Sequence, residues 1–85
     1  IDKKQYGIIL ANVEDSMHVL SKFIDFLNLH KIDWHDRNIK FWITHILDTS
    51  DNIILHFEEE KIKNPRLIVS VENIREYVSE MRKKL

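Results

Sequence analysis

The sequence predicts an α+β domain, in which an N-terminal helix is followed by a three-stranded antiparallel meander and a C-terminal helix. Three observations predict this order. Apolar residues recur at helical spacing in the first thirty residues and again after Glu72. In the segments between, apolar residues alternate with polar ones, as in strands. With 85 residues, the chain has room for a single small domain over 1–85.

The first predicted element is a helix over residues 3–30. Its apolar positions follow one another at steps of four and three residues, the heptad spacing of helices that pair with other helices. This helix-pairing seam consists of Tyr6, Leu10, Val13, Met17, Leu20, Ile24 and Leu27. The spacing is also compatible with a coiled coil that begins upstream. Because Gly7 weakens the first turn, a second interpretation makes residues 6–13 a strand and starts the helix at Asp15 or Ser16.

Residues 38–85 are predicted to form the sheet and the last helix. The predicted strands, in which apolar and polar residues alternate, are 38–47, 53–58 and 66–71. The polar residues 48–52 are predicted to be the turn of the first hairpin. From Glu72 the helical period returns, with acidic residues early and basic residues late, as the helix dipole favours.

The phase of the first strand divides neighbouring aromatic residues between two faces of the sheet. Phe41 points toward the predicted core, and Trp42 points to the opposite face. Truncation of Phe41 is therefore predicted to cost more folding stability than truncation of Trp42. The predicted partner-binding row on the outer sheet face consists of Trp42, Ile46, Ile54 and Ile68. Four large apolar side chains on one exposed face usually mark a contact with another protein.

An all-α helical bundle is the alternative fold. The chain contains one Gly and one Pro, so it has little of the turn punctuation that hairpins need. Asn64 and Pro65 can also be the N-cap and the first residue of a helix. A helical repeat that places Ser50 on its apolar side accommodates Ile39, Ile43, Ile46, Ile53 and Phe57.

Composition argues against several classes of function. Thirteen basic and fourteen acidic residues give a formal charge of −1, which argues against nucleic-acid binding. The lack of cysteine excludes disulfides and thiol chemistry, and it fits an intracellular location. No apolar run approaches the roughly 20 residues that span a membrane.

Neither a metal site nor a catalytic site is predicted. The five histidines do not have the spacing of HExxH or zinc-finger motifs, so no metal or cofactor is expected. No serine lies near a histidine in a nucleophile motif, and no glycine-rich loop could bind a phosphate. The consecutive acids Glu58, Glu59 and Glu60 are interpreted as a charged strand edge. We therefore expect no enzymatic activity.

Four segments resemble a known family. They are FIDFLNL at 23–29, NIKFWITHILD at 38–48, NIILHFEEE at 52–60 and NIREYVSEMRKKL at 73–85. After a coiled-coil-like lead, they resemble the RWD-like globular heads of kinetochore coiled-coil proteins. The resemblance implies a non-catalytic head that pairs with a sister subunit and binds a receptor peptide.

The predicted function is a non-enzymatic protein–protein interaction or assembly domain. Its partner would be another protein chain or a second copy, bound through the helix-pairing seam and the outer sheet face. The alternative hypothesis is a small ligand- or RNA-binding regulatory domain of ferredoxin-like type, which requires residues 6–13 to be a strand.

Overall fold

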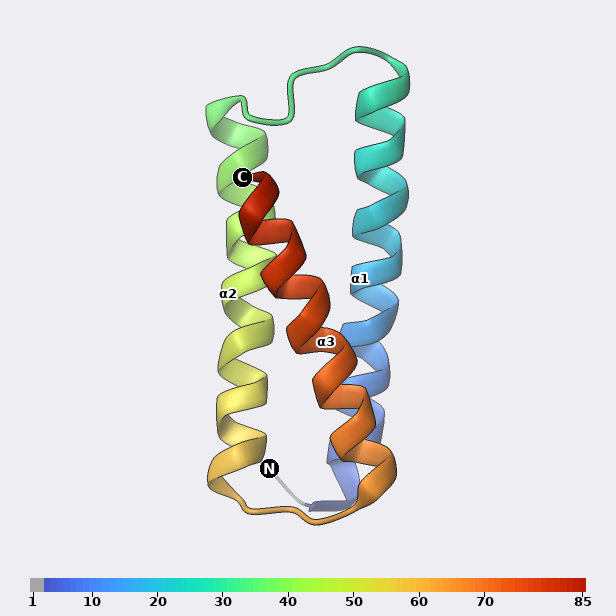
Figure 1. The fold of residues 1–85 in the computed structure, drawn as a ribbon, viewed down its shortest axis with the longest axis vertical. Coiled ribbons are helices and arrows are strands. Elements are labelled where there is room, and N and C mark those ends of the chain that lie inside the picture. The colour runs from blue at the N-terminus through green and yellow to red at the C-terminus, as the bar shows by residue number, and fades with distance from the viewer. Residues whose placement is uncertain (1–2) are drawn as a thin grey trace.

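The computed structural model describes residues 3–85, which form three long helices (Figure 1). A short 3-10 helix, η1 (Lys3–Gln5), leads into α1 (Tyr6–Leu29), and α2 (Arg37–Glu59) and α3 (Pro65–Lys84) follow. The helices α1 and α2 run in opposite directions, and α3 crosses both on one side (Figure 1). The bundle measures 43 × 19 × 18 Å, so it is more than twice as long as it is wide.

The predicted α+β fold is wrong, because the three segments assigned to the meander are helical. The predicted turn at 48–52 lies in the middle of α2. There the hydroxyls of Thr49 and Ser50 each donate, at 2.9 Å, to the backbone carbonyl four residues earlier. These polar side chains are therefore satisfied without interrupting the helix. Residues 6–13 are helical too, so the ferredoxin-like alternative has no strand at that position.

One stripe of each helix contributes to a single core. All seven residues of the helix-pairing seam of α1 are buried. They are joined by Ile43, Leu47, Ser50, Ile54 and Phe57 of α2 and by Val71, Ile74, Val78 and Met81 of α3. Because the chain covers this seam with its own α2 and α3, the seam is not free to pair with another chain while the bundle is closed.

The second and third helices begin at side-chain caps. The carboxylate of Asp36 accepts a hydrogen bond from the backbone N–H of Asn38 at 3.1 Å. The Asn64 side chain accepts from the N–H groups of Arg66 and Leu67, and Pro65 is the first residue of α3. Both caps satisfy amides that lack a partner within the helix, and proline has no N–H to leave unpaired.

Just beyond the end of α1, and again just beyond the end of α2, a lysine adopts the left-handed conformation. Lys31 and Lys61 have φ angles of 55° and 52°. After α1, the N–H of Lys31 bonds to the carbonyl of Asn28, and the N–H of Ile32 bonds to the carbonyl of Leu27. This is the Schellman arrangement, which usually has glycine at its left-handed position. The chain therefore turns twice without the residue that marks such turns in a sequence.

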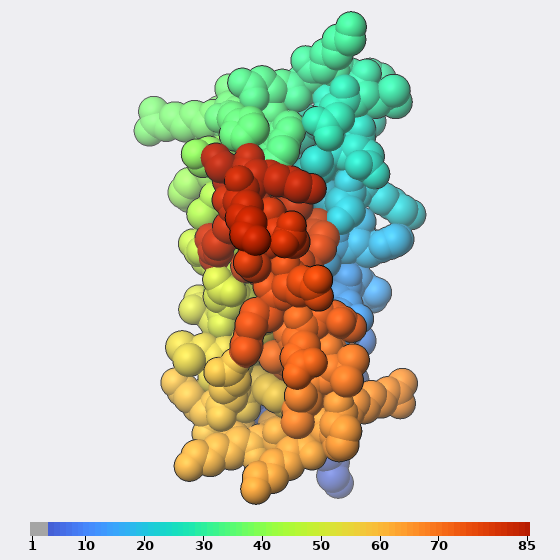
Figure 2. Space-filling view, viewed as in Figure 1, coloured from blue at the N-terminus to red at the C-terminus, as the bar shows by residue number. Residues whose placement is uncertain are grey.

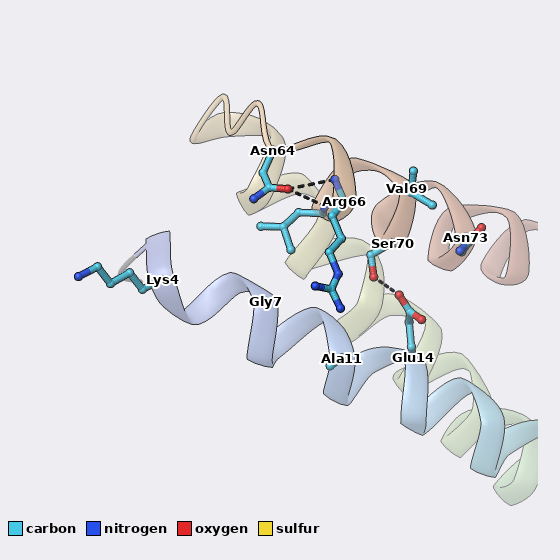
Figure 3. A pocket seen from close by; sticks show the side chains of 10 residues that line it. Lys4, Gly7, Ala11, Glu14, Asn64, Arg66, Val69, Ser70 and Asn73 are labelled. Carbon is cyan, nitrogen blue, oxygen red and sulfur yellow. Dashed lines mark hydrogen bonds between the residues drawn. The ribbon is translucent and has the colours of Figure 1, made fainter.

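The third helix is tied to α1 by hydroxyl and carboxylate groups. Ser70 donates a hydrogen bond to Glu14 (Figure 3). Farther along, the hydroxyls of Ser21 and Tyr77 are 2.7 Å apart and share a hydrogen bond. The space-filling view shows α3 lying over α1 and α2 on this side of the molecule (Figure 2).

Ion pairs tie α3 to α2. Arg75 pairs with Glu58, and the Arg82 guanidinium donates to Asp48 at 2.8 Å and to Asp51 at 2.5 Å. The side-chain hydrogen bonds with these two aspartates raise the pKa of Arg82 above its ordinary value. Between Tyr6–Leu29 and Arg37–Glu59, by contrast, no side-chain hydrogen bond or ion pair is formed. The polar contacts between helices therefore lie on the side that α3 covers.

Candidate functional site

An open groove of about 580 Å³ lies between α1 and α2, and no residue of α3 lines it. We call it the outer groove. It is lined by Ile9, Asn12, Val13, Asp15, Ser16, Val19 and Leu20 of α1 and by Trp42, His45, Ile46, Thr49, Ser50 and Ile53 of α2. Three buried residues, Val13, Leu20 and Ser50, form part of the lining, so the groove reaches down to the interior of the bundle.

The outer groove follows a second set of heptad-spaced residues on each helix, which we call the outer stripes. On α1 and its C-cap, the outer stripe is Ile9, Asn12, Ser16, Val19, Phe23, Phe26 and His30. On α2 and its C-cap, it is Ile39, Trp42, Ile46, Thr49, Ile53, His56 and Glu60. Residues at this spacing share one face of a helix, so each helix has a second continuous face beside its core stripe.

Several large apolar side chains on the outer stripes are exposed. Val19 is 62% exposed, Phe26 is 50% exposed and Trp42 is 43% exposed. The rings of Phe23 on α1 and Trp42 on α2 meet edge to face, with centroids 5.3 Å apart. Val19 and Trp42 also line the outer groove together, and an exposed apolar patch usually marks an interaction site.

The outer groove has little charge. Asp15 is the only carboxylate among its lining residues, which include no lysine or arginine. A helical face that stays in water normally has charged side chains. The polar groups here are instead small and mostly uncharged, as in Asn12, Ser16 and Thr49. The groove can therefore make uncharged contacts, but it offers no cluster of groups for acid–base or phosphate chemistry.

The four residues of the predicted partner-binding row do not share a surface. Trp42 and Ile46 line the outer groove. Ile54 is in the core at 5% exposure, and Ile68 is on α3, 37% exposed. The row depended on the period of two of a strand, whereas successive helix residues are rotated by about 100°. Two of the four residues thus belong to the candidate site, because they lie four residues apart on one face of a helix and not because they share a face of a sheet.

The structure also reverses the predicted positions of Phe41 and Trp42. Phe41 is 75% exposed and therefore is not a core residue. Trp42 is the more buried of the two, and it contacts Phe23. The sequence interpretation missed Val19 as a groove residue, and it missed Phe23 and Phe26 as members of the same outer stripe. Their heptad spacing was the available signal, but it was hidden by the stronger seam beside it.

A second cavity, of about 670 Å³, lies between the beginnings of α1 and α3 (Figure 3). Arg66 extends from α3 into this space, and the bond between Ser70 and Glu14 crosses it (Figure 3). Asn64 already caps the first amides of α3, so they are not free to bind an anion. A methyl group on Gly7 would make an ordinary 3.9 Å contact with Leu67, so close helix approach does not require this glycine. We assign no ligand to this cavity.

Tyr6 is a fully buried titratable residue at the start of α1. Its ring packs edge-on against Phe57, with centroids 5.5 Å apart, and its hydroxyl has no hydrogen-bond partner. Burial raises the pKa of Tyr6 above its ordinary value, and the nearby Glu60 and Glu59 raise it further. The hydroxyl therefore stays protonated, enclosed in the core and away from the outer groove.

The described residues hold no cluster of three or more His, Cys, Asp or Glu side chains that could bind a metal ion. Within residues 3–85, no helix combines the length and the apolar character needed to cross a membrane. Comparison with protein-family models, curated proteins and solved structures finds no match. The outer groove is therefore the surface of this chain that bears on its function.

Proposed function

We propose that this chain is a non-enzymatic protein–protein interaction domain that binds its partner at the outer groove. The observation that carries the proposal is the groove itself, in which exposed Val19 and Trp42 lie among neighbours of which Asp15 is the only carboxylate and none is Lys or Arg. Covering these side chains would remove apolar surface from water, at about 25 cal/mol for each Å². The groove has no competing feature, such as a charged cluster, that would require water.

The form of the groove favours a helix as the element that binds. Sites for small molecules are concave and bury most of the ligand surface. The outer groove is instead open on one side between two long helices, with apolar and small polar residues at steps of three and four. An amphipathic helix presents its own apolar residues at the same spacing, so it can pack along such a groove.

The proposal keeps only one part of the family resemblance. The RWD-like resemblance implies an α+β head, whereas residues 3–85 form three helices. The implied fold is thus not the observed one, and the proposal does not use the receptor peptide or the sister subunit of that family. It retains the binding of a protein partner, which the outer groove supports independently.

Site-specific photo-crosslinking in cells that express the protein tests this proposal. A photoreactive phenylalanine analogue at Thr49 would lie in the outer groove, and the same analogue at Glu76, exposed on α3, is the matched control. We expect a discrete protein adduct from position 49, absent from position 76 and lost when Val19 is also replaced by Glu. Equal adducts at both positions, or none at position 49, would contradict the proposal.

A further inference from the structure

We propose that the partner in the outer groove is a second copy of this chain, so that two copies pack their outer stripes against each other about a two-fold axis. This inference rests on the proposed function and names the occupant of the groove. Three features of the molecule support it: its surface area, the charge of the outer stripes and the length of the exposed face.

The surface area of the chain exceeds that of a typical monomer by the amount that one interface removes. The accessible surface is 6179 Å². A folded monomer of 10.3 kDa is expected to expose about 5,400 Å². The excess is about 800 Å², which equals the share that each partner buries in an interface of standard size. An interface of standard size would therefore bring each copy to the ordinary ratio of surface to mass.

The charge of the outer stripes allows a copy to face itself. Glu60, at the end of the α2 stripe, is their only Asp, Glu, Lys or Arg residue. The whole chain has a formal charge of −1, so its copies repel each other only weakly. A strongly charged foreign helix would find few complementary groups along these stripes. A partner with the same uncharged face fits better.

The exposed face is also long enough for an interface between two copies. Apolar members of the α1 stripe extend from Ile9 to Phe26, which corresponds to about 25 Å of helix. Those of the α2 stripe extend from Ile39 to Ile53. A two-fold interface uses the same patch on both partners, so a second copy brings two stripes of equal length. The α1–α2 pairs of the two copies would then stack face to face as two layers of a four-helix arrangement, with an α3 on each outer side.

The mass of the purified chain in solution, measured by sedimentation equilibrium from about 1 to 500 μM, tests this inference. We expect the mass to rise from that of one chain toward that of two. Val19→Glu places a charge in the outer groove, at a residue that is 62% exposed in the monomer. Val69→Glu is the matched control, because Val69 is 54% exposed on α3 and does not line the outer groove. We expect Val19→Glu to abolish the rise in mass and Val69→Glu to preserve it.

Circular dichroism will show that both variants fold, since both replaced residues are exposed on helices. A single-chain mass at every concentration would overturn the inference, and so would a dimer that Val19→Glu leaves intact. Neither result contradicts the proposed function, because an adduct from Thr49 to a different protein would still support a groove that binds another partner. An adduct with the mass of two chains would support both.

Discussion

The two sides of the α1–α2 pair have the same heptad spacing, but α3 covers one side and leaves the other open. On one side, α3 closes over a core stripe that is apolar at all seven positions of α1. On the other, the outer stripe of α1 has Asn12 and Ser16 between its apolar residues, and much of it is exposed. Heptad spacing therefore identifies the helix faces that can pack against another helix. The continuity of apolar residues then distinguishes the face that is always buried from the one that is open.

The largest expected difference between the two sides comes from adjacent residues of α1. Leu20 is fully buried, and Val19 is 62% exposed. Leu20→Ala should reduce the free energy of unfolding by about 3 to 5 kcal/mol, because it leaves a cavity in the core. Val19→Ala should change it by about 0.5 kcal/mol or less when measured on dilute monomer. Urea denaturation of both variants checks the contrast, and similar losses would mean that the outer face is packed in the monomer.

A smaller difference is expected between Phe41 and Trp42 on α2. Trp42→Ala should lower the free energy of unfolding by about 1 to 2 kcal/mol, because Trp42 loses its ring contact with Phe23 and part of its burial. Phe41→Ala should cost about 0.5 kcal/mol or less, since Phe41 is 75% exposed. Thermal unfolding of the two variants checks this order. The opposite order would favour the strand phase that the structure contradicts.

The N-terminal helix could be predicted from the sequence because one apolar repeat extends along its whole length, whereas the alternative strand at residues 6–13 accounts for only part of it. A single repeat, with steps of four and three residues, includes all seven seam positions, and all seven are buried. In residues 38–59 the apolar residues are denser, so a period of two and a period of 3.6 both find support. A glycine or proline at the ends of the segment would have distinguished a helix from a hairpin. The helix ends, however, use Lys31 and Lys61 in the left-handed conformation, which leaves no such mark in the sequence.

The candidate site was predictable only in part. Trp42 and Ile46 were identified as partner-binding residues, and both line the outer groove. Ile54 and Ile68 were grouped with them by the strand phase, and the helical fold separates them. The position of α3 decides which of two heptad stripes on α1 and α2 is covered. That position depends on long-range contacts, such as those of Arg82, which no local pattern specifies.

A modest effect is expected from loosening the covered side at Arg82. Its guanidinium joins α3 to Asp48 and Asp51 of α2, but its side chain is 38% exposed and therefore screened by solvent. Arg82→Gln should lower the free energy of unfolding by about 0.5 to 1 kcal/mol at low salt. The loss should shrink in about 1 M NaCl, because salt weakens the ion pairs of the unmodified chain. A loss unchanged by salt would show that Arg82 stabilises the bundle through packing instead.

The smallest effect at neutral pH, and the most specific one at alkaline pH, is expected from the Tyr6 hydroxyl. Burial, followed by Glu60 and Glu59, raises the pKa of Tyr6 in the folded chain. The folded chain therefore holds this proton more tightly than the unfolded chain, in which tyrosine titrates near pH 10. At pH values well below about 10, the Tyr6 hydroxyl is protonated in both the folded and the unfolded chain, so its contribution to stability does not change with pH. As the pH rises above about 10, the unfolded chain releases the proton first, so the folded state loses stability.

Tyr6→Phe removes only the hydroxyl, which has no hydrogen-bond partner. The variant should therefore match or exceed the stability of the unmodified chain at pH 7 and lose less of it between pH 9 and 11. Tyr77→Phe is the control, because its hydroxyl bonds to Ser21. If Tyr6→Phe lost stability as steeply with pH as the unmodified chain, the alkaline transition would belong to groups outside this end of the core.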